Sequence, residues 1–275
     1  MRAILVNDTA LRNFHFGCYL VCQAIREQLA KRGIDLVASF SNQVRVEDLT
    51  EIKDRFDFII VNGEGSIHHG RHRVLVELAA RFPSFLINCT LQETSPDGLD
   101  LFKYIAVRES MSADFLQRCN VNYETVPDVI FVSSALTRYE GQKVTVRDLG
   151  ISDSVTGCPG LITRLLDRRN FFTVKGQVVD DYVRFMVQSK RLCLGRFHAV
   201  CLAAKFGIPF SSWDSNTWKI EGIMRDMGVS KYHFKTFAEA YENVPTESDA
   251  SVIKYAQDAP VRVENMFDTI LDLVE

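Results

Sequence analysis

The sequence lacks any apolar run long enough to cross a membrane, since about 18 or more consecutive apolar residues occur nowhere in it. It also lacks an excess of charge of one sign, because 35 acidic and 32 basic residues leave a net charge of −3. This balance gives no general attraction to a polyanion, so we expect no nucleic-acid partner. Any site for an anion has to be local.

Cysteines are few, and their spacing fits neither a metal site nor a disulfide framework. The 7 cysteines are an odd number and suit a reducing compartment. Cys18 and Cys22 lie four residues apart in an expected helix, where we predict two buried thiols rather than a metal or redox pair. Residues 1–6 show a short strand pattern instead of a signal peptide, and we expect a cytoplasmic protein.

Three common catalytic signatures are also missing. The sequence has no Gly-x-Ser-x-Gly elbow, no Walker-type Gly-Lys-Ser/Thr and no Asp-x-Asp metal pair. Esterase and P-loop NTPase chemistry are therefore disfavoured. What is present is an ordinary globular composition, with 47% hydrophobic and 24% charged residues.

The apolar pattern predicts an α/β protein in which strands and helices alternate. Such alternation implies parallel sheets with ligands at the carboxyl ends of the strands. The periodicity weakens over 133–150, where we expect a linker. We therefore predict two facing doubly wound, Rossmann-like domains at 1–140 and 141–275, the second with the C-terminal helices, and a ligand cleft between them. Strands are expected at 3–6, 34–40, 58–61, 84–88, 104–107, 123–131, 151–156, 171–174, 191–194 and 208–212, and helices at 17–32, 46–53, 74–81, 110–118, 161–168, 180–189, 197–206, 219–227, 237–242 and 249–273.

The segment Gly195-Arg196-Phe197-His198-Ala199 is the most informative for function. It follows an expected strand, turns at Gly195 and enters a helix whose body is small and apolar. The helix dipole favours an anion at this end, so Arg196 and His198 are predicted to form a ligand site. A core histidine satisfied by the backbone is the alternative for His198.

Arg108 follows the expected strand at 104–107, at the edge where a guanidinium could hold a phosphate or carboxylate. Pairing of Arg108 with Glu109, or with another carboxylate at the start of the next helix, fits the spacing equally well.

A glycine-bearing turn follows the expected strand at 58–61 and precedes a helix. Backbone N–H groups of Gly63, Gly65 and Ser66 could line an anion site at the helix start, although glycine is common in any such turn. Glu64 is a candidate general base. His68 opens a basic stretch, 68–73, which favours an anion. We predict no metal, because no nearby cysteine or second carboxylate completes a zinc site.

The order of these segments resembles the polysaccharide pyruvyl transferase family. The Arg196-x-His198-Ala199 segment with its downstream proline is the most specific match, and the matching segments run from about residue 5 to 228. Two of them are altered in this chain, where Asn-Phe-His-Phe-Gly-Cys replaces the usual Asn-x-Gly-Asp and Gly-Glu-Gly replaces Gly-Gly-Gly. The matching positions are Asn13, Gly17, Gly63 to Ser66, Val107 to Ser110, Phe115, Leu116, Pro127, Asp128, Arg196, His198, Ala199, Ala203, Gly207, Pro209, Lys219, Gly222 and Gly228.

The resemblance implies a glycosyltransferase-B-like fold, and transfer of a pyruvyl group from phosphoenolpyruvate to a hydroxyl pair of a sugar in a cell-surface polysaccharide or its precursor. Phosphoenolpyruvate is a substrate, and no cofactor is implied. By position, the catalytic residues would be His198, Arg196 and Arg108, and the donor would contact these three and Lys219. The acceptor or glycine-turn residues would be Asn13, Gly63, Glu64, Gly65, Ser66 and His68.

Two other functions stay open from the residues alone. The same basic site could hold the diphosphate of a nucleotide-sugar, with Glu64 or Asp8 as base, which would make the protein a glycosyltransferase. It could also belong to a non-catalytic sugar- or anion-binding protein.

The expected partner is a saccharide acceptor, and a lipid-linked acceptor would bring the protein to the inner face of the membrane. The amphipathic segment 261–274 could dock on that membrane or pack on the first domain. Its charges are mostly acidic, at Glu264, Asp268 and Asp272, which disfavours anionic lipid. We therefore predict packing within the chain.

Overall fold

The computed structural model describes residues 1–11, 15–71, 73–141, 144–156, 170–174 and 178–275. Its contacts divide the chain into two compact units. Unit 1 comprises Met1–Asn13, Val21–Val132 and Pro260–Glu275, and unit 2 comprises Phe14–Leu20 and Ser133–Ala259. The two helices α1 (Phe16–Lys31) and α10 (Ala250–Val274) therefore each contribute to both units, which a single boundary at residue 140 does not describe.

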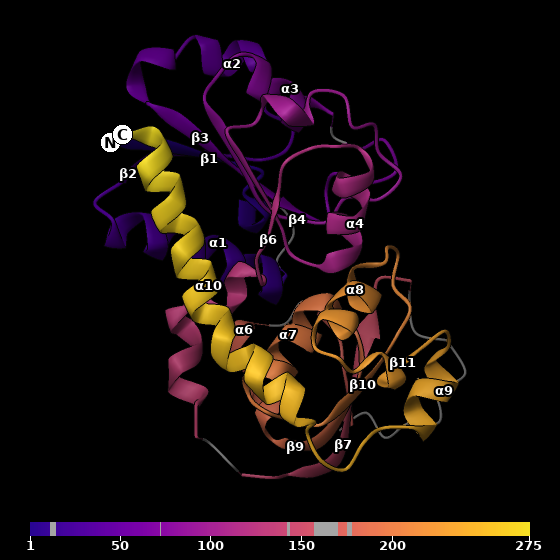
Figure 1. The fold of residues 1–275 in the computed structure, drawn as a ribbon. Helices are drawn as coiled ribbons and strands as arrows, with labels where there is room; N and C mark the ends of the chain where they lie inside the picture. Colours follow the sequence, from indigo (N-terminus) through magenta and orange to yellow (C-terminus); the bar gives the residue numbers. More distant parts are fainter. Residues whose placement is uncertain (12–14, 72, 142–143, 157–169, 175–177) are drawn as a thin grey trace. The chain divides into compact units, whose positions relative to one another are not determined.

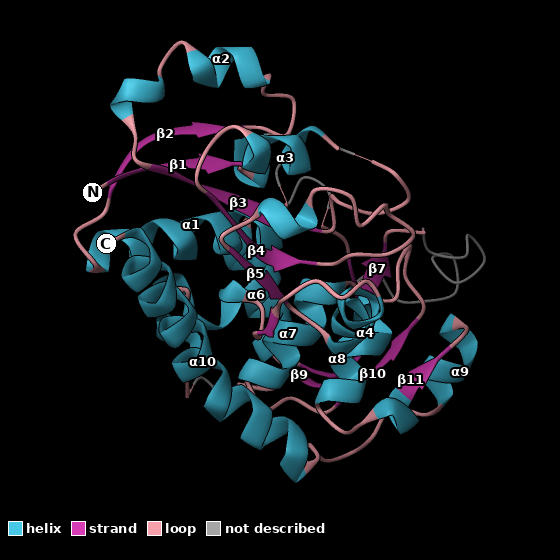
Figure 2. Cartoon of the chain, turned by 45° about the horizontal axis from the view of Figure 1, so that its top comes forward, coloured by secondary structure: helices cyan, strands magenta, loops and turns pink. Residues whose placement is uncertain are grey.

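Unit 1 contains a sheet of six parallel strands in the order β2-β1-β3-β4-β5-β6. Figure 2 shows the first five of these side by side in this order. Apolar side chains of the central strands, such as Ile4, Val61 and Leu86, are fully buried and form one core cluster. The elements are β1 (Arg2–Val6), β2 (Asp35–Phe40), α2 (Val46–Thr50), β3 (Phe58–Glu64), α3 (Val74–Glu77), β4 (Ser84–Cys89), β5 (Tyr104–Val107), α4 (Ser110–Arg118) and β6 (Glu124–Thr125), with 3-10 turns at Thr9–Leu11, Lys53–Arg55, Leu78–Ala80, Leu99–Leu101 and Val129–Val132.

Unit 2 contains a second sheet of five parallel strands, in the order β11-β10-β9-β7-β8. A core cluster around Ile151, Cys193 and Trp213 packs against it. Its elements, labelled in Figure 1 except for β8 and the 3-10 turns, are β7 (Arg147–Ser154), β8 (Phe171–Phe172), α6 (Val179–Val187), β9 (Ser189–Gly195), α7 (Phe197–Lys205), β10 (Phe210–Trp213), α8 (Lys219–Asp226), β11 (His233–Phe234) and α9 (Phe237–Glu242), with 3-10 turns at Ser134–Tyr139 and Ser230–Tyr232.

The two sheets share one topology. In each sheet the first strand of the unit lies between the second and the third. The second strand is therefore added on one side of the first, and the later strands are added on the other side. Ligands of open α/β sheets bind at this topological switch point, outside the carboxyl ends of the strands. The switch points lie between β1 and β3 in unit 1, and between β7 and β9 in unit 2.

The predicted fold class, α/β with doubly wound parallel sheets, is confirmed. Three predicted segments are wrong in detail. The extended segment at 123–131 is reduced to β6 and a 3-10 turn, and the expected linker at 133–150 contains a 3-10 turn and the start of β7. Strand β3 runs on to Glu64, past its expected end. The turn at 157–160 and the helix at 161–168 lie outside the described residues.

The C-terminal part of α10 packs within the chain, as predicted. Glu264 accepts a hydrogen bond from Lys31 at 2.8 Å, and Asp268 accepts one from Arg32 at 2.8 Å. Its apolar face is buried, including Phe267 and Ile270. Among the helices that the structure describes, none combines the length and apolar character needed to span a bilayer.

Candidate active site

Polar residues follow both strands at the switch point of the second sheet. The N–H of Gly195 donates to Ser152 Oγ at 3.0 Å, which ties the end of β9 to β7. Arg196 donates to Asp153 from Nε at 3.0 Å and from Nη2 at 2.6 Å. The side chains are only 12% and 9% exposed. The arginine predicted to bind an anion is thus already held by a carboxylate, and this bidentate pair fixes the plane of its guanidinium.

His198 lies in the first turn of α7, where Arg196 is the N-cap residue, and it is buried. Its ring rests against the backbone of Gly17, where a Cβ would lie 2.1 Å from Nδ1. Only glycine leaves room for so close an approach. The neighbouring Phe16 stacks on Tyr182 with ring centroids 3.7 Å apart. The start of α1 is therefore anchored in unit 2, against His198.

His15 precedes α1 and lies beside His198, with ring centroids 5.9 Å apart. Its Nδ1 accepts a hydrogen bond from the N–H of Gly17 at 3.2 Å, so the ring proton is on Nε2. Burial, followed by the positive charges of His198, Arg196 and Lys219, lowers the pKa of His15 to about 3. His15 is therefore a neutral imidazole at physiological pH.

Lys219 is the first residue of α8, and its side chain is buried. Its Nζ donates to Asn216 Oδ1 at 2.6 Å, and its charge acts on His15. We call His15, Arg196, His198 and Lys219 the basic cluster. Three of these four residues were predicted as donor-binding, and the charges of all three lower the pKa of His15. Such a cluster can hold an anionic group and place a histidine next to it for proton transfer.

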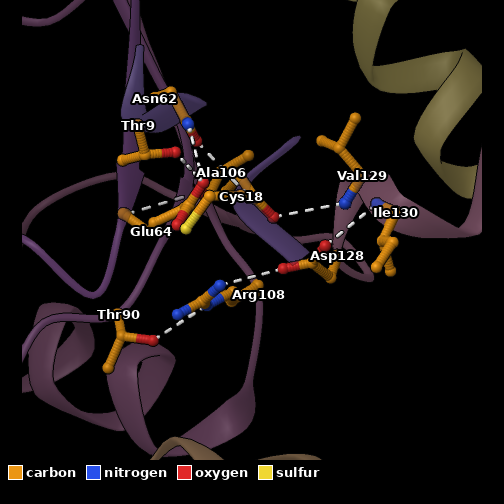
Figure 3. A network of polar contacts seen from close by, with 12 residues as sticks. Thr9, Cys18, Asn62, Glu64, Thr90, Ala106, Arg108, Asp128, Val129 and Ile130 are labelled. Atoms are coloured by element: carbon orange, nitrogen blue, oxygen red, sulfur yellow. Dashed lines mark hydrogen bonds and ion pairs between the residues drawn. The ribbon is translucent and has the colours of Figure 1, made fainter. Parts of the chain in front are cut away.

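The switch point of the first sheet carries amides and a carboxylate instead. Asn7 follows β1, and its Nδ2 donates to the carbonyl of Asn62 and to Ser66 Oγ. Glu64 Oε1 accepts from Thr9 Oγ1 at 2.7 Å and from Asn62 Nδ2 at 3.0 Å (Figure 3). Asn7 and Glu64 have φ values of 59° and 38°. Left-handed backbone at residues other than glycine is strained and is often found at functional sites.

Arg108 follows β5 as predicted, but its guanidinium is buried and only 2% exposed. It donates from Nη1 to Asp128 Oδ2 at 2.9 Å and from Nε to Thr90 Oγ1 at 3.0 Å (Figure 3). Glu109, the alternative partner, caps α4 by accepting from the N–H of Ser112 at 3.0 Å. Arg108 thus forms a buried ion pair at the end of β5, and its contact with a donor stays a prediction.

The glycines of the turn after β3 serve local packing in this structure. Gly63 lies within β3, where a Cβ would be 2.1 Å from the Cβ of Cys89, so its lack of a side chain allows β3 and β4 to pack. Gly65 and Ser66 form a turn closed by the Ser66 N–H on the Gly63 carbonyl at 3.0 Å. No helix starts there, because α3 begins at Val74. An anion site at this turn therefore stays a prediction.

His68 belongs to a separate pair of histidines. Its Nδ1 is 2.6 Å from Nδ1 of His69, and His69 Nε2 is 3.2 Å from a carboxylate oxygen of Glu93. Within the part of the chain that the structure describes, no three His, Cys, Asp or Glu side chains form a group that could hold a metal. Asn13, predicted on the acceptor side, lies outside the described residues.

The prediction of two buried thiols is confirmed for one of them: Cys18 is only partly buried, whereas Cys22 is buried beside the first switch point. Its burial, followed by the nearby charge of Glu64, raises the pKa of its thiol to about 12. The thiol therefore stays protonated and unreactive.

Two residues of the second switch point escaped prediction. They are Asp153 and His15. The only signals in the sequence are positional, because Asp153 ends a strand and His15 stands two residues before Gly17. Their roles depend on contacts with Arg196 and His198, about 40 and 180 residues away in sequence.

The two parallel sheets with alternating helices define an α/β protein of the doubly wound type. Solved structures share this fold at low sequence identity. An uncharacterised protein from Klebsiella pneumoniae is 13% identical, with 86% of this chain and 93% of that chain covered and a TM-score of 0.58. The UDP-GlcNAc 2-epimerase of Methanocaldococcus jannaschii is 10% identical, with coverage of 94% and 99% and a TM-score of 0.58. The corresponding enzyme from Neisseria meningitidis is 12% identical, with coverage of 100% and 99% and a TM-score of 0.53.

Sequence comparison identifies the family. The polysaccharide pyruvyl transferase family matches residues 15–212, which is most of the chain, and the protein belongs to this family. The matched range includes His15, Arg108, Arg196 and His198. No curated protein matches the sequence of this chain.

Proposed function

We propose that this protein transfers a pyruvyl group from phosphoenolpyruvate to two hydroxyls of a saccharide, in a cell-surface polysaccharide or its precursor. The observation that carries the proposal is the basic cluster at the switch point of the second sheet. Phosphoenolpyruvate bears a phosphate and a carboxylate, and its binding requires concentrated positive charge. The overall charge of −3 does not supply this, so the cluster has to.

The reaction converts an enol phosphate into a ketal. A proton adds to the methylene carbon C3, which becomes a methyl group and leaves positive charge at C2. One saccharide hydroxyl attacks C2, phosphate departs with the electrons of its C–O bond, and the second hydroxyl closes the ketal. One hydroxyl proton restores the acid and the other leaves with phosphate.

His198, in its protonated form, is our choice for the acid that protonates C3, because Gly17 fixes its ring beside the other basic groups. Lys219 and Arg196 offset the negative charge of the donor. Arg108 is already neutralised by Asp128, so we assign it a positioning role at the end of β5.

The acceptor belongs, in this proposal, at the switch point of the first sheet. The amides of Asn7 and Asn62 and the carboxylate of Glu64 suit uncharged hydroxyls, and a buried carboxylate disfavours a second anion. Glu64 is the candidate base for an acceptor hydroxyl. A lipid-linked acceptor would place the reaction at the inner face of the membrane.

Binding of the donor is tested by ligand-induced shifts in melting temperature. Phosphoenolpyruvate should stabilise the wild type, and Lys219→Ala should need roughly tenfold more of it, since a hydrogen bond to a charged group is lost. Lys231→Ala is the matched control, because Lys231 is an exposed lysine of the same unit, paired with Asp249 at 3.2 Å. Stabilisation by UDP-sugars but not by phosphoenolpyruvate would instead support a glycosyltransferase.

Turnover is tested by following phosphate release from phosphoenolpyruvate with a panel of methyl glycosides. His198→Ala should lower the rate about 100-fold or more while donor affinity changes little, because general acid catalysis is lost. Gly17→Ala should act in the same direction by displacing the ring of His198. Near-normal rates in both variants contradict the assignment. Donor binding without phosphate release, unaffected by His198→Ala, would indicate a non-catalytic binding protein.

A further inference from the structure

The imidazole of His15 is fixed by the helix that follows it. Its Nδ1 accepts from the N–H of Gly17 at 3.2 Å and lies 3.5 Å from the backbone nitrogen of Cys18. These donors occupy Nδ1 and keep it unprotonated. The carbonyl of His15 accepts from the N–H of Tyr19 at 3.0 Å, so the residue caps α1 with both its backbone and its ring. Among the described residues, no hydrogen bond engages Nε2.

The ring has positive groups around it from two other helices. His198 and Arg196 lie at the start of α7, and Lys219 lies at the start of α8. Burial is the main reason that the pKa of His15 falls to about 3, and all three of these residues lower it further. The carboxylate of Asp153 is engaged by Arg196. A helix N-terminus combined with neighbouring cations keeps an imidazole neutral, so that it acts as an uncharged N–H donor.

We propose that His15 is a further ligand-binding residue, whose neutral imidazole donates its Nε2–H to a phosphate or carboxylate oxygen of the anion held by the basic cluster. The inference rests on the proposed function for the identity of that anion. A neutral donor adds a hydrogen bond without adding repulsion among the cations of the site. His15 does not move a proton, and that task stays with His198.

Two substitutions of His15 distinguish the capping role of Nδ1 from the donor role of Nε2. In His15→Asn, Oδ1 stands the same number of bonds from Cβ as Nδ1, so the cap is kept and the Nε2 donor is lost. In His15→Gln, Nε2 stands where the ring Nε2 does, so the donor is kept and the cap is lost.

Binding of inorganic phosphate, measured by calorimetry, should weaken about tenfold in His15→Asn and by less than about threefold in His15→Gln. The melting temperature should instead fall by about 2–4 °C in His15→Gln and stay near that of the wild type in His15→Asn. Equal phosphate affinity in the wild type and His15→Asn would overturn the inference.

Nuclear magnetic resonance gives a readout that a purely structural role would not change. With labelled histidine, the ring of His15 should be the neutral Nε2–H tautomer at physiological pH, and its Nε2 resonance should shift when inorganic phosphate binds. A protonated ring, or no shift on binding, contradicts the inference. Phosphate binding that follows the predicted order without any turnover of phosphoenolpyruvate would refute the proposed function and leave His15 as an anion ligand. Turnover with unaltered phosphate binding in His15→Asn would do the opposite.

Discussion

Acid should destabilise unit 2 through His15. In the unfolded chain, His15 has an ordinary pKa of 6.5, whereas burial and the cations around it lower the pKa to about 3 in the folded protein. Between these two values the unfolded state binds a proton that the folded state does not. The free energy of unfolding therefore rises with pH across this window, and the stability that is fully present above about pH 6.5 is lost as the pH falls toward 3.

The size of this effect follows from the two pKa values. At about pH 4.5 the unfolded residue is almost fully protonated and the folded residue almost fully neutral, so the difference corresponds to about two pK units. Each unit is worth about 1.4 kcal/mol, and His15 alone should cost about 3 kcal/mol between pH 7.5 and 4.5. This is a large share of the stability of an ordinary domain.

The assay compares the wild type with His15→Asn, which keeps the helix cap and removes the titrating ring. Both tryptophans of the sequence, Trp213 and Trp218, lie in unit 2, so their fluorescence during urea unfolding follows that unit. The wild type should lose about 3 kcal/mol more than His15→Asn on acidification, and other titrating groups cancel in the comparison. Equal losses would show that His15 takes up a proton while folded, and the account of the basic cluster would fail.

Two further substitutions test the packing around the switch points. Asp153→Asn removes the carboxylate from a nearly buried ion pair and leaves Arg196 uncompensated. Tryptophan fluorescence should therefore show unit 2 destabilised by about 3 kcal/mol. An unchanged urea midpoint would show that the Arg196–Asp153 ion pair does not stabilise the unit. Gly63→Ala places a methyl group 2.1 Å from the Cβ of Cys89. Melting followed by circular dichroism should show unit 1 destabilised by about 1–3 kcal/mol. A melting curve like that of the wild type would contradict the close approach of these two residues.

Local sequence patterns predicted most of the fold, because the spacing of apolar residues along the sequence matches the positions that are buried in the structure. The fully buried strands β3 and β4 contain the uninterrupted apolar runs 58–61 and 85–87, which is the pattern of a parallel sheet. The errors occurred at the ends of strands, as in β3 and β7, and at very short elements. Strand β6 has two residues and is an edge strand, so it has too little period to recognise.

The site was less predictable, because its chemistry depends on long-range pairing. The sequence shows Arg108 and Arg196 after strands, but not that Asp128 and Asp153 already neutralise them. It also shows His15 before a helix without showing His198 beside it. Residue type and strand position therefore locate the sites, whereas the free charge of each site follows only from the partners that folding supplies.

The two sheets have their switch points at the same place in the topology, yet different charged groups lie at them. At the first, Asp8 pairs with Arg26, and the carboxylate of Glu64 accepts hydrogen bonds from Thr9 and Asn62. At the second, the carboxylate of Asp153 pairs with Arg196, and His198 and Lys219 add further basic groups that act on His15. Because basic groups attract anions and carboxylates repel them, we expect the proposed phosphorylated donor in unit 2 rather than in unit 1. Topology thus determines where each unit can bind a ligand, and the balance of a few buried charges determines which ligand that can be.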